Sequence, residues 1–305
     1  FVRGLWLILL ELVILRGFGW QFNFDYRVTM LTVLWALGWA MILLSVLVYL
    51  PTWAVTVVGV VLIATHNLFD RVQPAQLGAL APLWNILHAP GVILNHPSHL
   101  VFVAYTLVPW VGVTAAGYGL AQVFGWDCER RQAFLLRLGI ALTVTFVILR
   151  AVNVYGDPLP WSKQKSSLFT VLSFLNTNKY PPSLLYLLMT LGPGLILLRT
   201  FDGKSSGLLR PALMFGKVPL FYFMLHVVLI HLLAVLVCHV RYGEAHWMFE
   251  SNRLDQFPIT QPPDWPVDLP VVYLIWVFVV LALYPLCRWF AGVKRRRKDW
   301  WLSYL

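Results

Sequence analysis

Apolar runs about as long as a lipid bilayer is thick recur along the whole of this 305-residue chain. A helix needs roughly 20 apolar residues to cross the hydrocarbon core. About eight runs qualify, near 3–19, 27–49, 52–69, 99–124, 132–154, 181–199, 217–240 and 270–292. Because 59% of the residues are apolar and only 12% are charged, a water-soluble fold is excluded. We predict an all-α fold, a polytopic integral membrane helix bundle that forms one domain over residues 1–305.

The positive charge of this chain collects at the ends of alternate runs, as the positive-inside rule requires of cytoplasmic segments. The segments assigned to the cytoplasm carry Arg130, Arg131, Lys204, Arg210 and the basic, aromatic tail 293–305 with Trp300 and Trp301. The opposite side receives 23–26, 70–99, 155–180 and an acidic loop with Glu244, Glu250, Asp255, Asp264 and Asp268. Both ends of the chain are then cytoplasmic. The net charge of +10 follows membrane topology, so we predict no nucleic-acid partner.

Six polar residues within the predicted spans are functional candidates, because ionisable groups there are costly and by default face the bundle interior. They are Glu11, Arg16, Arg150, Asn153, His226 and His231. Each has a structural alternative to a functional role. Glu11 and Arg16 could form ion pairs between helices, the arginines could extend to the interface, and a lone histidine is often a packed core residue.

His66 and Asp70 are four residues apart, so in an α-helix they share one face at the outer end of the third span. A carboxylate beside an imidazole fixes its tautomer and raises its basicity, as general-base catalysis requires. Helix capping is the alternative. In the following loop, His96 and His99 are three apart but lack further ligands at a suitable spacing, so we predict no metal site.

A second polar stretch runs from Ser173 to Leu185 and places Asn176, Asn178, Lys179 and Tyr180 just before a helix that begins with prolines. Helix N-termini attract anions and carbonyl oxygens, and a lysine strengthens that attraction. We therefore assign these residues to substrate binding. Interfacial solvation and asparagine capping are the alternatives.

These stretches also carry a family resemblance. The motifs are 66–70, Pro109-Trp110-Val111-Gly112, 176–193, 218–226 and the ending 284–304. In this order they resemble bacterial members of the heparan-α-glucosaminide N-acetyltransferase-like transmembrane acyltransferases, over nearly the whole chain. The resemblance implies a protein of ten or eleven helices in the bacterial inner membrane. The chain begins at Phe1 within apolar sequence, so we expect N-terminal sequence to be missing, and with it the family's essential histidine.

The resemblance implies transfer of an acetyl group from cytosolic acetyl-CoA, the co-substrate, to an amine or hydroxyl of an extracytoplasmic sugar or glycan. We expect His66 and Asp70 to be catalytic, and Arg150, Asn153, Asn176, Asn178, Lys179, Tyr180 and His226 to contact substrate. Arg130, Arg131, Lys204, Arg210 and Lys217 could hold the coenzyme A phosphates, or simply set topology. The partners are then acyl-CoA, the acceptor and membrane lipids, with the oligomeric state open. A solute transporter and a non-catalytic membrane scaffold are the alternative functions.

Overall fold

The computed structural model describes residues 1–19, 22, 24, 26–203, 207–250, 260–262, 264, 265 and 267–304. Asn23, Lys204 and Asp255 of the predicted loops lie outside them. Where the sequence predicted one domain, the chain divides into two compact units. The first unit comprises 1–5, 31–95 and 102–204, and the second comprises 6–30, 96–101 and 205–305. Helix α1 (Val2–Leu10) crosses the boundary between them.

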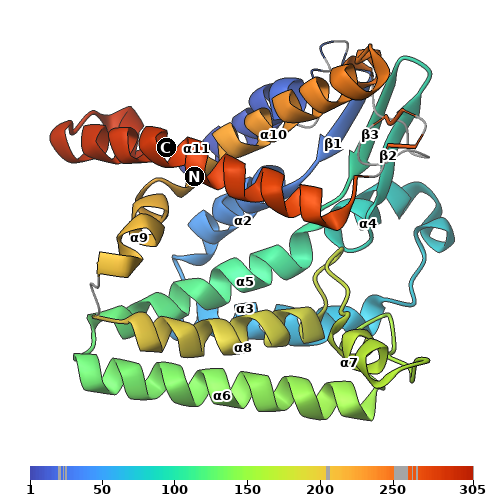
Figure 1. Ribbon diagram of the computed structural model, residues 1–305. Coiled ribbons are helices and arrows are strands. Elements are labelled where there is room, and N and C mark those ends of the chain that lie inside the picture. The colour runs from blue at the N-terminus through green and yellow to red at the C-terminus, as the bar shows by residue number, and fades with distance from the viewer. Residues whose placement is uncertain are drawn as a thin grey trace. The chain divides into compact units, whose positions relative to one another are not determined.

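The first unit is a stack of helices (Figure 1). Its α-helices are α2 (Val33–Leu47), α3 (Thr52–Thr65), α4 (Ala81–Leu87), α5 (Leu107–Leu120), α6 (Cys128–Val152), α7 (Ser167–Leu175) and α8 (Leu184–Phe201). Shorter 3-10 helices cover His66–Phe69, Pro74–Leu80 and Ala121–Gly125. Helix α3 packs on α5, α6 packs on α8, and α2 packs on α5.

Glycines set the closest helix contacts of this unit. A Cβ atom on Gly59 of α3 would lie 2.7 Å from the carbonyl oxygen of Gly112 in α5. A Cβ atom on Gly139 of α6 would lie 2.8 Å from the carbonyl oxygen of Gly192 in α8. Small residues let helix backbones approach in lipid, where helix association depends on packing. Gly117 of α5, in contrast, has no atom within 4 Å of an added Cβ.

The second unit contains a nine-residue π-helix (Glu11–Gly19), α9 (Arg210–Lys217), α10 (Pro219–Tyr242) and α11 (Leu269–Arg296). Its 3-10 helices are Gly207–Leu209, His246–Phe249 and Trp300–Tyr304. Helix α10 packs on the π-helix and on α11. Within the π-helix Arg16 is buried and donates to the Thr29 hydroxyl at 3.1 Å, and its guanidinium lies over the ring of Tyr26.

Six described helices are long and apolar enough to cross a membrane, so the predicted helical membrane fold is confirmed. They are Thr52–Phe69, Leu107–Gly125, Cys128–Val152, Leu184–Phe201, Pro219–Tyr242 and Leu269–Arg296. The runs at 27–49 and 99–124 were wrongly predicted to be helical throughout. Each begins as a strand of a small sheet with the order β1-β3-β2, formed by β1 (Val28–Leu31), β2 (Gly91–His96) and β3 (His99–Val103).

Candidate functional site

The predicted site residues of the first unit lie at one end of its helix stack, where α3 and α6 end and α5 and α8 begin. Three contacts between distant segments define this end. The backbone N–H of Leu184 donates to Asn67 Oδ1 at 2.8 Å, the Tyr155 hydroxyl donates to the Ala64 carbonyl at 2.5 Å, and the Tyr105 hydroxyl lies 3.4 Å from that of Tyr180. We call this region the polar end.

At the polar end, α3 tightens into a 3-10 helix over His66–Phe69, which changes the expected partner of Asp70. With three residues per turn, positions i and i+3 share a face and positions i and i+4 do not. Asp70 therefore accepts a hydrogen bond from Asn67 Nδ2 at 2.8 Å, and its other oxygen lies 3.1 Å from Nε2 of His88. The expected hydrogen bond between His66 and Asp70 is absent among the described contacts, because it assumed α-helical geometry.

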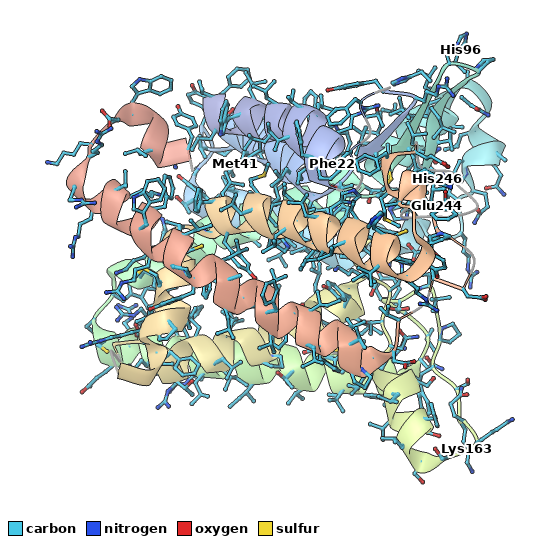
Figure 2. The ribbon with its side chains drawn as sticks, turned by 45° about the horizontal axis from the view of Figure 1, so that its top comes forward. Phe22, Met41, His96, Lys163, Glu244 and His246 are labelled. Atoms are coloured by element: carbon cyan, nitrogen blue, oxygen red, sulfur yellow. The ribbon has the colours of Figure 1, made fainter. Side chains whose placement is uncertain are left out.

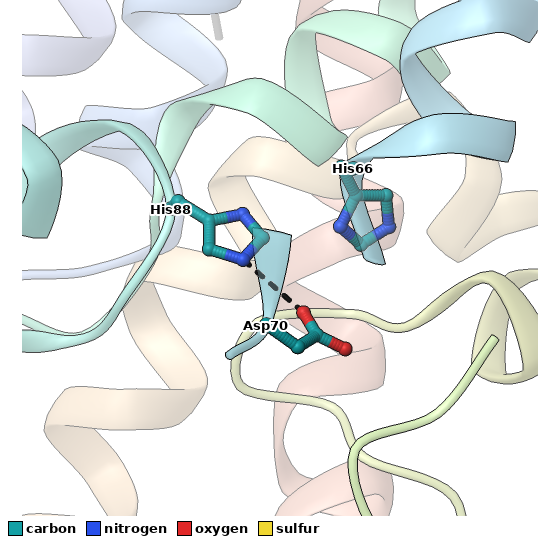
Figure 3. Close-up of side chains that lie close together, drawn as sticks. All are labelled: His66, Asp70 and His88. Atoms are coloured by element: carbon teal, nitrogen blue, oxygen red, sulfur yellow. Dashed lines mark hydrogen bonds and ion pairs between the residues drawn. The ribbon is translucent and has the colours of Figure 1, made fainter. Parts of the chain in front are cut away.

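His66 is left as a buried imidazole without a hydrogen bond. Its exposed fraction is 2%, and neither ring nitrogen has a partner among the described residues. Its ring centroid lies 5.9 Å from that of the buried His88. Figure 3 shows both imidazoles beside Asp70, with only His88 bonded to the carboxylate. Unpaired buried polar atoms are rare in folded proteins, so His66 is a strong candidate for a ligand contact.

One donor atom from each of His66, Asp70 and His88 lies within 4.8 Å of the other two, so this trio could also hold a metal ion. Two histidines and a carboxylate are a common ligand set for zinc. His96 and His99, considered earlier for metal binding, are used otherwise. His96 lies at the tip of the β2–β3 hairpin (Figure 2) and bonds the Ser98 hydroxyl, and His99 Nε2 lies 3.4 Å from the Thr29 hydroxyl.

Two further buried donors lie level with His66. The Oγ1 of Thr106 and the Nε1 of Trp110, at the start of α5, have no hydrogen-bond partner among the described residues. Their depth follows from helix register. An added Cβ on Gly112 of α5 would contact Ile63 of α3, and these two helices are antiparallel. His66, three residues after Ile63, therefore lies at the same depth as Pro109, three residues before Gly112. The polar end thus presents unpaired donors from α5 near the depth of the unpaired imidazole from α3.

Arg150 is a clamp for the segment that follows α6. Its side chain is 1% exposed, and its guanidinium donates to four backbone carbonyls at 2.7 to 3.2 Å, those of Leu159, Ser173, Phe174 and Asn176. It also lies 3.8 Å from the carboxylate of Asp157. Arg150 and Asn176, both predicted to contact substrate, are brought together through the backbone of Asn176. These contacts give Arg150 a structural role, but its side chain turns inward and does not extend to the interface.

The predicted asparagines also bond to the backbone of this segment. Asn153, with φ of 58°, ends α6 and exchanges two hydrogen bonds with Trp161, at 3.0 and 3.1 Å. Asn178 donates from its amide to the Pro181 carbonyl at 3.0 Å, and its backbone N–H donates to Asp157. Asp157 also accepts from the Ser183 hydroxyl, which caps α8. These residues fix the shape of the loop between α6 and α8.

Three predicted substrate contacts remain, Lys179, Tyr180 and His226. Lys179 and Tyr180 are both exposed, and the Lys179 ammonium lies 5.2 Å from the centroid of the Tyr180 ring. Tyr180 reaches the polar end through the Tyr105 hydroxyl. His226 belongs to α10 of the second unit, where its Nδ1 bonds the carbonyls of Tyr222 and Phe223 in its own helix.

Burial and the Asp70 carboxylate together set the protonation of the Tyr155 phenol at the polar end. The phenol of Tyr155, outside the spans, has a raised pKa because burial and the nearby Asp70 carboxylate both disfavour its anion. Tyr155 thus remains a neutral donor to Ala64. Of the cations considered for coenzyme A, Arg131 instead forms a two-point ion pair with Asp202 at 2.8 and 3.1 Å, which lowers the pKa of Asp202.

Comparison with known proteins gave no significant match to a protein-family model, a curated protein or a solved structure.

Proposed function

We propose that this protein is a membrane-embedded acyltransferase that moves an acetyl group from acetyl-CoA to an amine or hydroxyl of an extracytoplasmic sugar or glycan. One observation carries the proposal, namely that the His66 imidazole is buried within the polar end with both nitrogens unpaired. A positioned imidazole is the commonest general base in enzymes. The resemblance to the heparan-α-glucosaminide N-acetyltransferase-like proteins supplies the reaction class.

In this reaction His66 accepts the proton of the acceptor N–H or O–H while the acceptor atom bonds to the thioester carbonyl carbon. The carbonyl electron pair moves onto oxygen and forms a tetrahedral oxyanion. When this intermediate collapses, the carbon–sulfur bond breaks, and the proton held by His66 passes to the coenzyme A thiolate. The acylated acceptor and free coenzyme A leave, and His66 is again neutral.

Asp70 supports the charged stage of His66. When His66 holds a proton, the Asp70 carboxylate within 4.8 Å offsets the positive charge. Asn67 keeps this carboxylate in place, and Leu184 in turn fixes Asn67, so the support extends from α3 to α8. Asp70 thus acts on His66 by position and charge, while its hydrogen-bond partner is His88.

Thr106 and Trp110 are the proposed oxyanion donors, in place of Lys179 and the asparagine amides. Their unpaired O–H and N–H groups are buried, which strengthens a hydrogen bond to a developing negative charge. The side-chain amides of Asn153 and Asn178 already donate hydrogen bonds to backbone carbonyls, and Lys179 is exposed. In this scheme the loop held by Arg150 shapes the wall of the site, and Lys179 and Tyr180 contact the acceptor at its rim.

The test uses the full-length protein in vesicles with acetyl-CoA labelled in the acetyl group and a panel of amino sugars and glycans. We expect free coenzyme A to be released only when an acceptor is present. His66→Ala should reduce this turnover by at least about 100-fold, the usual contribution of a general base. His96→Ala is the matched control, because it removes an exposed histidine at the hairpin tip and should leave turnover unchanged.

Uptake of an intact solute without thioester cleavage would refute the acyltransferase and favour the transporter. Neither cleavage nor uptake would favour the scaffold. If His66→Ala lowered the yield of folded protein as much as the turnover, His66 would be a packing residue and the proposed base would be wrong.

A further inference from the structure

The second unit contains a basic cavity that the proposed reaction does not use. Its volume is about 680 Å³, within the range of small-molecule sites. It lies between α9 and the last turns of α11, and five cationic side chains line it together with one indole ring. They are Lys217, Arg288, Lys294, Arg295, Arg296 and Trp289.

The charge of this cavity is uncompensated. No carboxylate lines it, and none of its five cations forms a salt bridge within the described part of the chain. Topology-setting charges need only lie near a span end, whereas these cations surround a common hollow. Such an arrangement favours a ligand that carries concentrated negative charge, of which phosphate is the commonest.

The length of α11 places the cavity at the depth of lipid headgroups. Its 28 residues extend about 42 Å at 1.5 Å per residue, and a hydrocarbon core is about 30 Å thick. The apolar part of α11, which begins at Leu269, spans the hydrocarbon core. The turns from Arg288 to Arg296 therefore reach the headgroup layer. Trp289 is 59% exposed there, as expected of an interfacial aromatic residue.

The part of α11 that precedes Arg288 has an apolar surface that lipid acyl tails can contact. Leu281 of α11 is an exposed apolar side chain about two turns before Arg288 on the same helix face, and the exposed Leu274 lies about two turns before Leu281 on that face. A phospholipid whose phosphate enters the cavity can therefore lay its tails along α11. A soluble phosphate compound has no use for this apolar surface.

We propose that this cavity binds the headgroup of an anionic phospholipid, with the phosphate held by Lys217, Arg288 and Arg295 and the tails along α11. The site is independent of the proposed acyl transfer, which lies in the first unit. The same phosphate chemistry could be met by coenzyme A, so the experiment includes a soluble competitor.

The experiment measures lipid binding to the full-length detergent-purified protein by native mass spectrometry, with phosphatidylglycerol and phosphatidylcholine titrated separately. We expect clear preference for phosphatidylglycerol. Lys217→Gln with Arg295→Gln should weaken its binding about 30-fold, from about fivefold for each cation near a membrane surface. The matched control, Arg210→Gln with Lys298→Gln, removes equal charge outside the cavity lining and should keep the preference.

A second variant fills the cavity and keeps its charge. Gly292 lines the hollow, and a Cβ there would meet only Arg296, at 4.0 Å, so Gly292→Phe should fold and block lipid binding. Gly216→Phe in α9 is its control, because an added Cβ there meets nothing.

Three results would overturn the proposal. Equal binding of the two lipids would show that the cavity does not select an anionic headgroup. Equal loss of binding in the two double variants would make the effect one of net charge. Displacement of bound phosphatidylglycerol by millimolar coenzyme A or inorganic pyrophosphate would assign the cavity to a soluble phosphate compound.

Discussion

Arg150→Met should destabilise the first unit strongly, since it removes the centre of the clamp after α6. The substitution leaves four backbone carbonyls without their donor and the buried Asp157 carboxylate without its nearby cation. A hydrogen bond from a charged group contributes about 1.5–3 kcal/mol, but bonds that act as a unit do not add. Removal of one partner from a buried ion pair costs about 3–5 kcal/mol, and we expect a loss in this range.

The assay is reversible unfolding in mixed micelles with sodium dodecyl sulfate, followed by tryptophan fluorescence. Arg150→Lys keeps the charge but has three donors in place of a planar fork, so it should recover only part of the lost free energy. Arg137→Met is the matched control on α6, because Arg137 is exposed and its loss should change the free energy of unfolding by no more than about 0.5 kcal/mol. Equal effects of the two methionine substitutions would refute the clamp.

Three other changes test the packing and chemistry of the first unit. Gly59→Leu should destabilise the α3–α5 pair by about 1–3 kcal/mol or more in the same assay, because its Cβ would lie 2.4 Å from a backbone nitrogen; wild-type stability would contradict this. Trp110→Phe should lower kcat for acetyl transfer about 100-fold with little change in folding, and unchanged kcat would exclude it as an oxyanion donor. Excess Zn²⁺ should inhibit turnover, because it would bind His66, Asp70 and His88, and a chelator should reverse the inhibition. His88→Ala should weaken this inhibition, because it removes one of the three ligands.

The membrane spans could be predicted from sequence because the bilayer imposes one simple requirement, a long apolar helix. Six of the predicted runs meet it. The strands at Val28–Leu31 and His99–Val103 could not be separated from the spans, because short apolar runs have no periodicity that distinguishes strand from helix. The first run is helical over 2–19 but changes from α to π geometry at Glu11, which hydropathy does not reveal.

The sequence placed polar residues in the right stretches but could not predict their contacts. The helix end that carries His66 contacts Tyr155 and Leu184, on either side of the loop between α6 and α8. His88 lies 18 residues from Asp70, a spacing without helical meaning, so its contact with Asp70 depends on the tertiary fold. Whether Arg150 extends to the interface or turns inward depends on the loop carbonyls it meets. Thr106 and Trp110 were missed as donors, because an unpaired hydrogen-bonding group is a property of the packed structure.

Chemical rescue measures the role of His66 most directly. His66→Gly opens a space in the polar end that free imidazole could occupy, and imidazole in the medium should restore acceptor-dependent release of coenzyme A in proportion to its concentration. His96→Gly should need no rescue and show no response. A folded His66→Gly protein that stays inactive at every imidazole concentration, or one that is fully active without it, would contradict the account of His66 as the base.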